Sequence, residues 1–429
     1  MQFLSISQAM KQGSGLVKIR GWCYRQRSSN KFIFIVLRDS TDIIQCVVSK
    51  DKVNEKTWKD ADKVRIEFSL EIEGTIKEDK RAPTGYEIDV SKLHIVAPSE
   101  TFPITKDKST EFLLDVRHLW LRSRQMTDIM KVRSAVLEAC NEFFKKEGYY
   151  ETAPPIITGS SCEGGSTQFE IKYFDEKAYL SQSAQLYLEA LIFSLEKVWA
   201  LTPSFRAEPS RTQRHLAEYW HCEMEAAWMG FEGLQKFEEE MISFICQYAA
   251  KNAGGQLSAL GRKPADLKKV KPPFPRLSYD EALKELAKKG HKVKWGEDLR
   301  TEEERLLTEK LTKPLIVTQY PKAIKAFYMK EDPKNAKLVL CNDVLAPEGF
   351  GEIIGGSERE TDNAKLIKRL KEAGESTKDY QWYLDLRKYG SVPHSGFGLG
   401  IERVVRWLCK LESIRDAIPF PRTIARKYP

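Results

Sequence analysis

Two alternating runs separated by a charged loop, residues 198–228, constrain the fold of this chain more than any other stretch. The runs KVWALTPSF and YWHCEMEAAW each alternate as a strand does, so a β-hairpin is predicted. The connection carries three arginines and a histidine rather than the Gly, Asn or Asp of a tight turn. Arg206 and Glu208 are two residues apart, which places both side chains on one face of a strand. A solvated surface loop is the alternative, but this spacing favours side chains directed at one ligand.

Composition is that of an ordinary soluble protein of two or three domains. The chain has 429 residues, of which 41% are hydrophobic and 30% charged, and a formal net charge of +8 that is compatible with a polyanionic partner. It lacks a run of eighteen apolar residues and the pattern of a secretory signal, so neither a membrane span nor export is expected. The eight cysteines form no CxxC pair, which argues against a zinc site or a disulfide framework and favours a cytoplasmic location.

The order of strand and helix patterns predicts an α+β protein. Residues 1–100 contain five short alternating runs broken by Gly, Asp, Ser and Lys, which indicates a five-stranded β-barrel. Residues 101–120 are expected to link two domains, because proline and small polar residues gather at their start. Residues 121–429 mix strands and helices. They predict a mixed, mostly antiparallel sheet flanked by helices, with an insertion around residues 251–340.

A second pattern, GFGLGIER, puts Gly396, Gly398 and Gly400 at alternate positions of a strand that leads into a helix with Arg403. The alternation leaves one face of the strand without side chains, so a flat ligand could lie against the backbone. Tight packing of a strand on a helix would select the same residues. The third glycine comes too early for the dinucleotide-binding pattern GxGxxG.

Two further patterns concern carboxylates and prolines. Asp343 and Glu352 flank the sequence VLAPEGFG, and oxygen ligands of this kind suit Mg²⁺ that bridges phosphates. Each carboxylate taken alone is equally compatible with an ordinary surface position. The stretch GYYETAPPIIT joins the end of a predicted helix to a strand through Pro154 and Pro155. Prolines cannot donate to a β-ladder, so they indicate a sheet edge or an interface.

Together these patterns resemble the three sequence motifs of the class II aminoacyl-tRNA synthetases. The helix and strand with Pro155 are similar to the first motif, a dimer interface in that family. FRAE with RHLAEYWHCE resembles the second motif and GFGLGIER the third, in the same order. The runs RGWCYRQR and FIFIVLRDSTDIIQ resemble the anticodon-binding OB-fold of the aspartyl, asparaginyl and lysyl subgroup. The resemblance covers nearly the whole chain and implies a homodimer that uses ATP and tRNA.

The family's chemistry assigns a role to the charged hairpin. The amino-acid carboxylate attacks the α-phosphorus of ATP, and the protein supplies positioning and charge neutralisation rather than a general base. The resemblance implies that Arg206 and Arg403 are catalytic. Arg206 would hold the α-phosphate and the substrate carboxylate, and Arg403 would cover the adenine and meet the γ-phosphate. Glu208 would accept from the adenine amino group, and Tyr219 would stack on the base.

The remaining phosphate and metal contacts are implied in the same way. Arg214 and His215 would reach the β- and γ-phosphates of a bent ATP molecule. Asp343 and Glu352 would hold Mg²⁺, the cofactor that the resemblance implies.

The stretch SQSAQLYLEA and the second motif bear on the choice of amino acid. Aspartyl enzymes carry a lysine three residues after the glutamine that matches Gln185, whereas this chain has Leu188, which is also compatible with a plain core residue. Glu223 stands where aspartyl enzymes have Asp, and it would repel a carboxylate and accept from an amide. Arg359 would donate to the side-chain carbonyl, while Glu163 and Gln185 would bind the α-amino group. The expected substrate is L-asparagine.

The barrel is expected to bind the anticodon. The resemblance implies that Phe34 stacks on the central base, while Arg27 and Gln45 contact base edges or the backbone. A core position for Phe34 is the alternative. The expected reaction is ATP-dependent ligation of L-asparagine to tRNA(Asn) through an adenylate, with release of AMP and pyrophosphate.

Three alternatives to this reaction remain open. A non-discriminating aspartyl enzyme that charges both tRNAs would need a cation near Leu188. An asparagine synthetase derived from the catalytic domain would lack the barrel of residues 1–100. A non-catalytic RNA-binding or regulatory paralogue would be expected to have lost Arg206, Glu208 or Arg403, and all three are present.

Overall fold

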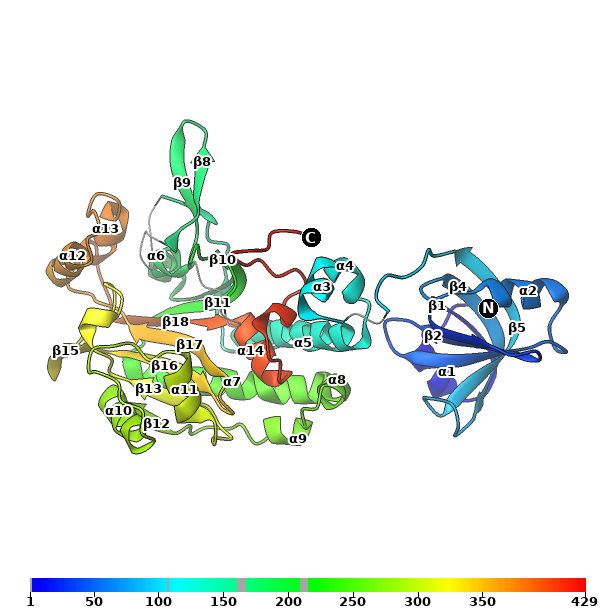
Figure 1. Ribbon diagram of the computed structural model, residues 1–429. Helices are drawn as coiled ribbons and strands as arrows, with labels where there is room; N and C mark the ends of the chain where they lie inside the picture. Colours follow the sequence, from blue (N-terminus) through cyan, green and yellow to red (C-terminus); the bar gives the residue numbers. More distant parts are fainter. Residues whose placement is uncertain (1, 106–107, 160–166, 209–214) are drawn as a thin grey trace. The chain divides into compact units, whose positions relative to one another are not determined.

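The computed structural model describes residues 2–105, 108–159, 167–208 and 215–429 (Figure 1). It divides into two compact units, Met1–Leu114 and Asp115–Pro429, and each unit has a hydrophobic core of its own. Within the described residues, none of the helices combines the length and the hydropathy that crossing a membrane requires.

The N-terminal unit is a closed five-stranded barrel, which confirms the prediction made from the alternating runs. The strands close in the order β1-β2-β3-β5-β4. Their bounds are β1 (Gly15–Ser28), β2 (Phe32–Arg38), β3 (Ile43–Ser49), β4 (Ser69–Glu78) and β5 (Tyr86–Ala97). Helix α1 (Ile6–Gln12) begins at a capping box, in which the side chains of Ser5 and Gln8 satisfy each other's backbone N–H groups. Helices α1 and α2 (Glu55–Lys63) add Ile6 and Ala61 to the barrel core.

The C-terminal unit is built on a mixed sheet of eight strands in the order β12-β13-β16-β17-β18-β11-β10-β6. The pairs β12–β13 and β6–β10 are parallel and the other neighbouring pairs are antiparallel. This confirms the predicted mixed, mostly antiparallel sheet. In sheet order the strands are β12 (Arg276–Ser278), β13 (Leu315–Thr318), β16 (Cys341–Ala346), β17 (Gly351–Glu358), β18 (His394–Gly400), β11 (Glu218–Ala227), β10 (Lys197–Phe205) and β6 (Tyr150–Glu151).

Two smaller sheets accompany the main one. The first, of β7 (Ile157–Thr158), β9 (Glu176–Leu180) and β8 (Glu170–Tyr173), carries a hairpin that projects from the unit in Figure 1. The second pairs β14 (Glu331–Asp332) with β15 (Asn335–Val339). The helices after the barrel are α3 (Thr110–Asp115), α4 (Arg117–Trp120), α5 (Arg124–Lys146), α6 (Gln185–Leu195), α7 (Phe231–Asn252), α8 (Gly254–Ala259), α9 (Pro264–Leu267), α10 (Tyr279–Lys288), α11 (Thr301–Thr308), α12 (Asn363–Glu372), α13 (Gln381–Lys388) and α14 (Ile401–Leu408), with 3-10 turns η2 (Lys322–Ile324) and η3 (Ile414–Asp416).

The two faces of the main sheet have opposite characters, because successive side chains of a strand alternate between them. On one face, Cys222 and Met224 of β11 and Phe397 of β18 join a core with residues of α5 and α7. These two long helices run along the sheet in Figure 1. On the other face, the same strands present His221 and Glu223 together with glycines of β18. The predicted hairpin is therefore present, and its polar side chains are gathered on the face away from the helices.

Two expected boundaries differ from the structure. The predicted linker 101–120 contains α3 and α4, and Arg117 in α4 is buried in the C-terminal unit. The predicted insertion 251–340 contains β12 and β13, which extend the main sheet rather than interrupt it. The place of Arg117 depends on contacts with residues distant in sequence, which local spacing does not indicate.

Arg117 fastens the end of the chain to the start of the C-terminal unit. Its guanidinium donates to the carbonyls of Pro419 at 2.9 Å and of Arg415 and Ile418 at 3.0 Å each. It also donates to Asp416 Oδ1 at 2.8 Å. A guanidinium offers five N–H groups in one plane, so one side chain can satisfy this whole turn.

Arg117→Met should destabilise the C-terminal unit by about 2–4 kcal/mol, because the buried carbonyls lose their donor. Denaturant unfolding followed by fluorescence measures the change. The matched control is Lys146→Met, which removes an exposed cation and should shift stability by less than about 0.5 kcal/mol. Equal stability of the two variants would contradict the role given to Arg117.

Candidate active site

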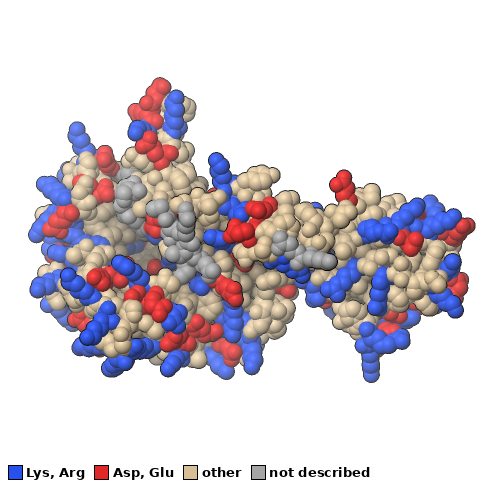
Figure 2. All heavy atoms as spheres, viewed as in Figure 1, with Lys and Arg blue, Asp and Glu red and all other residues tan. Residues whose placement is uncertain are grey.

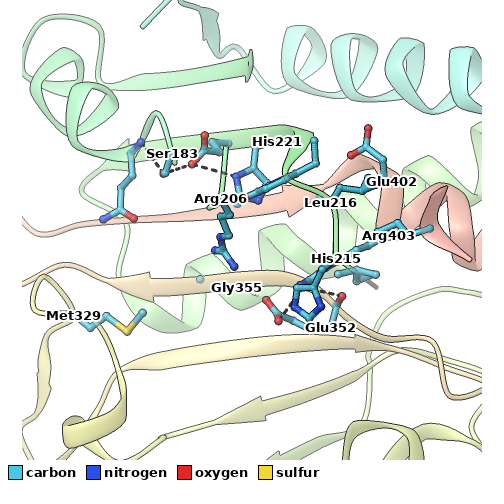
Figure 3. A pocket seen from close by; sticks show the side chains of 18 of the residues that line it. Ser183, Arg206, His215, Leu216, His221, Met329, Glu352, Gly355, Glu402 and Arg403 are labelled. Atoms are coloured by element: carbon cyan, nitrogen blue, oxygen red, sulfur yellow. Dashed lines mark hydrogen bonds and ion pairs between the residues drawn. The ribbon is translucent and has the colours of Figure 1, made fainter. Parts of the chain in front are cut away.

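The register of four adjacent strands creates a row of site residues across the sheet. Glu223 of β11 pairs with Gly398 of β18, Gly398 pairs with Gly355 of β17, and Gly355 pairs with Asp343 of β16. The two glycines in the middle have no side chains, so the carboxylates stand on either side of an open strip of backbone. This strip is the floor of a pocket (Figure 3). The pocket is lined by Ser183, Gln185, Arg206, His215, Leu216, Tyr219, His221, Glu223, Tyr328, Met329, Glu352, Ile353, Gly355, Gly356, Arg359, Gly398, Gly400, Glu402, Arg403 and Ile414.

The glycines of β18 have two different tasks. Gly398 and Gly400 line the pocket, as the open-face hypothesis requires. Gly396 does not line it, and a Cβ there would collide with Glu225 Oε2 and the carbonyl of Met224. The first glycine is therefore needed for close packing around a buried carboxylate, and the other two keep the pocket floor open.

Residues of the hairpin and of α14 gather at one end of the pocket. Arg206, Tyr219 and Arg403 all line it, and the Arg206 guanidinium lies 5.9 Å from the centre of the Tyr219 ring. In Figure 3, Arg206, His215 and Arg403 approach the same hollow from different elements. Glu208 lines an adjoining cavity together with Arg206, and its carboxylate is 3.9 Å from both Arg206 Nη1 and His215 Nε2. Arg214, which was predicted to bind the phosphates, lies outside the described residues.

An apolar wall at this end was not predicted. Leu216, Ile414 and Ile418 form a buried cluster against which Tyr219 packs. Two of them come from the C-terminal turn that Arg117 holds, far from the hairpin in sequence. Hydropathy alone could not assign them to the site, because isolated apolar residues occur in every core.

Asp343 and Glu352, the predicted metal ligands, lie side by side over Gly355. A Cβ on Gly355 would be 3.4 Å from Glu352 Oε1 and 3.8 Å from Asp343 Oδ1. Asp343 Oδ2 accepts from Lys325 Nζ at 2.9 Å, and Glu352 Oε2 is 2.9 Å from Arg403 Nη1. Burial, together with repulsion from Glu352, raises the pKa of Asp343 to about 6 in spite of Lys325. Burial also acts on Glu352, but attraction by Arg403 and Lys325 outweighs it and lowers the pKa to about 2.

The end of the pocket that the sequence predicts to bind the amino acid differs in part from that prediction. Gln185, Glu223 and Arg359 line it as expected. Leu188 does not, because it is fully buried in a cluster with Ile192 and Val198. The alternative of a plain core leucine is therefore correct for its position. Glu163 lies outside the described residues.

Two buried carboxylates organise this end. Glu223 accepts from the hydroxyl of Ser183 and, at 2.8 Å, from the backbone N–H of Ala184. Glu225, which was not predicted, accepts from Arg359 Nε at 3.0 Å and Nη2 at 2.9 Å. Its position two residues after Glu223 on a strand is the only sequence signal that could have indicated it.

Arg359 retains donors for a ligand. Nε and one N–H of Nη2 bind Glu225, and one N–H of Nη1 binds Ser357 Oγ at 2.7 Å. A guanidinium has five N–H groups, so two remain. Tyr328, a further pocket residue that the sequence did not indicate, places its ring centre 5.3 Å from this guanidinium.

Two of the three residues assigned to the anticodon, Arg27 and Phe34, lie on the outside of the barrel, whereas the third, Gln45, is buried. Arg27 of β1 pairs with Phe34 of β2, and its guanidinium lies 4.7 Å from the centre of the Phe34 ring. Gln45 of β3 pairs with the next outward position of β2, Val36, and donates to Glu87 Oε2 at 3.1 Å. Phe34 is half-buried rather than part of the core. Basic side chains gather on the visible face of the barrel in Figure 2.

Family models match both units. Residues 109–424 match the class II tRNA synthetases (D, K and N), and residues 17–96 match the OB-fold nucleic acid binding domain. The chain therefore belongs to the class II tRNA synthetases of the D, K and N group, which confirms the family predicted from the three motifs.

Relatives at 50% identity or more within this group include enzymes for asparagine. Asparagine–tRNA ligase from Thermococcus gammatolerans is 56% identical over 413 residues, and that from Thermoplasma acidophilum is 50% identical over 413 residues. Each alignment covers 96% of both proteins. The crystal structure of asparaginyl-tRNA synthetase from Pyrococcus horikoshii complexed with asparaginyl-adenylate is 50% identical, with a TM-score of 0.96 and full coverage of both chains.

His221 provides a test of the electrostatics of the pocket. Burial, and then repulsion by Arg206 and Arg403, lowers its pKa from 6.5 to about 3. The unfolded chain therefore takes up a proton below pH 6.5 that the folded protein does not, and stability falls as the pH falls. Between pH 6.5 and 4.5, the wild type should lose about 1.4 kcal/mol per pH unit more than His221→Gln. Denaturant unfolding at several pH values measures both slopes, and parallel slopes would show that the folded ring takes up the proton.

Proposed function

We propose that this protein ligates L-asparagine to tRNA(Asn) in two steps. The asparagine carboxylate attacks the α-phosphorus of ATP, pyrophosphate leaves, and a ribose hydroxyl of the tRNA terminus then displaces AMP from the adenylate. The observation that carries the proposal is that Arg206, Arg403, Glu223 and Arg359 line the same pocket. The relatives named asparagine–tRNA ligase, at 50–57% identity over nearly the whole chain, support it.

The charges of the nucleotide end suit the first step. Both the attacking carboxylate and the triphosphate are anionic, so their approach requires neutralisation. Arg206, in the hairpin connection, would bind both the α-phosphate and the amino-acid carboxylate. Arg403 would bind the outer phosphates. Tyr219, Leu216 and Ile414 supply an apolar surface for the adenine ring, and Glu208 accepts from its amino group. Positioning and charge neutralisation suffice for this reaction, so no general base is assigned.

Asp343 and Glu352 suit Mg²⁺ as their partner. The donor set consists of oxygen atoms, and the two carboxylates approach each other closely enough that the charge of Glu352 raises the pKa of Asp343. Bound there, Mg²⁺ would neutralise charge on the phosphates of ATP. In the protein itself, Lys325 and Arg403 balance the two carboxylates.

The amino-acid end favours an amide over a carboxylate side chain. The two unused N–H groups of Arg359 can donate to the side-chain carbonyl, and Glu223 can accept from the amide nitrogen. Glu225 already neutralises Arg359, so an aspartate carboxylate would meet two buried anions without an added cation. Gln185 is placed to bind the α-amino group.

The proposed enzyme is a homodimer in the cytoplasm, where its tRNA substrate is found. Pro155 is exposed beside Ile156 and Ile157, whose side chains are 38% and 46% exposed, and Tyr150 of the edge strand β6 is 59% exposed. A contiguous apolar edge of this kind supports contact with a second copy.

ATP–pyrophosphate exchange without tRNA tests the reaction. With Mg²⁺, asparagine should support exchange with a kcat/KM at least about 100-fold above that of aspartate, because a carboxylate leaves like charges unpaired. EDTA should abolish the exchange. Arg206→Met should lower kcat by roughly 10²–10³, since it removes a donor to the transition state. Equal exchange with aspartate would favour a non-discriminating enzyme, and no exchange with either amino acid would favour the non-catalytic paralogue.

The barrel assignment has a test that leaves the catalytic unit intact. Phe34→Ala should raise the KM for tRNA(Asn) in aminoacylation by roughly 5- to 100-fold, because a stacked base contributes about 1–3 kcal/mol. ATP–pyrophosphate exchange should be unchanged, since it needs no tRNA. An unaltered KM for tRNA would show that the central anticodon base does not stack on Phe34.

A further inference from the structure

Glu189 of α6 is a fully buried carboxylate that the motifs did not indicate. Its Oε2 accepts from Tyr383 Oη at 2.7 Å and from Arg387 Nη2 at 2.6 Å, and it lies 3.0 Å from His394 Nε2. Its Oε1 accepts from Gln185 Nε2 at 3.0 Å. Side chains from α6, α13 and β18 therefore meet on one anion. Burial raises the pKa of Glu189, but attraction by Arg387 and the hydrogen bond and charge of His394 together outweigh it and lower the pKa below its usual range.

This carboxylate is connected to both ends of the amino-acid pocket. Gln185, which it holds directly, lines the pocket at the α-amino end. At the side-chain end the connection runs through the backbone: the carbonyl of His394 accepts from the N–H of Arg359 at 3.0 Å. Arg387 Nε donates to the carbonyl of the next residue, Glu360, at 3.0 Å. Two partners of Glu189 thus hold the peptide that carries Arg359.

The charge of Glu189 also bears on selectivity. Arg387 is a buried cation behind the side-chain end of the pocket, and Glu189 pairs with it while Glu225 pairs with Arg359. An asparagine side chain adds no charge to this balance. An aspartate side chain would add one negative charge to a region already neutralised, at the cost of its own desolvation.

We propose that Glu189 is a positioning residue that sets the preference for an amide over a carboxylate substrate, a role that rests on the proposed function. It holds Gln185 and the Arg359 peptide in place, and it keeps Arg387 from acting as an unpaired cation. Glu189 thus neutralises Arg387, the buried cation that the fold brings close to the Arg359 peptide.

The test compares Glu189→Gln, Glu189→Gln with Arg387→Gln, and Tyr383→Phe by ATP–pyrophosphate exchange with asparagine and with aspartate. Glu189→Gln should lower kcat/KM for asparagine by about 10- to 100-fold and lower the asparagine-to-aspartate ratio at least about tenfold, because Arg387 is left unpaired. The double variant should recover at least about threefold of that ratio, because the charge is again balanced. Tyr383→Phe keeps the anion, so the ratio should stay within about twofold while asparagine KM rises.

The KM for ATP and the thermal midpoint separate this role from general damage. Glu196→Gln, at an exposed glutamate directly after α6, is the matched control and should leave all parameters unchanged. A Glu189→Gln variant with an unchanged ratio, or with equal losses for asparagine, aspartate and ATP that deepen in the double variant, would overturn the proposal. If the wild type itself showed no exchange with asparagine, the proposed function would fail instead.

Discussion

The pairing register of β11, β18 and β17 is the constraint on which the site depends. It places Glu223, Gly398 and Gly355 in one row, with Asp343 next to them on β16. Backbone hydrogen bonds fix this row, and a slip of one residue would turn every polar side chain into the helix-packed core. The core of α5 and α7 on the opposite face resists such a slip, because it buries Met224 and Phe397. Hydrophobic packing on one face of the sheet thus holds the polar side chains of the site on the other face.

Three carboxylates in and beside the pocket are paired with cations before any substrate arrives. Glu352 with Arg403, Asp343 with Lys325, and Glu225 with Arg359 each place an anion next to a cation. Buried charges need such partners, because desolvation is otherwise too costly. Substrates that carry charge must therefore compete with these partners or complement donors that remain unused. An anionic triphosphate can compete for Arg403, whereas a neutral amide can use the remaining N–H groups of Arg359 without separating its pair.

Much of the site was predictable where chemistry follows local spacing. Glu223 and Gly398 lie on strands whose periodicity determines which face each takes, Arg206 and Arg403 follow strands of the same two motifs, and the structure brings all four together. Leu188 was assigned to the pocket from the resemblance, because aspartyl enzymes carry a lysine at this position, and it lies instead in the core with Ile192 and Val198.

Residues whose roles depend on distant partners were not predictable. Glu189 contacts residues almost two hundred positions away, and Arg117 acts on a turn about three hundred positions away. Helix α4 within the expected linker acquires its place for the same reason, since Arg117 binds a carbonyl near the end of the chain.

The sequence by itself determined the barrel, the polar hairpin and the glycine-rich strand, because each depends on periodicity within a few residues, and the resemblance of its motifs identified the family. The tertiary structure alone decided which arginines are already neutralised, which leucines are core, and how α6, α13 and β18 join around one carboxylate. These outcomes depend on burial and on pairing between distant segments, and neither is encoded in local spacing.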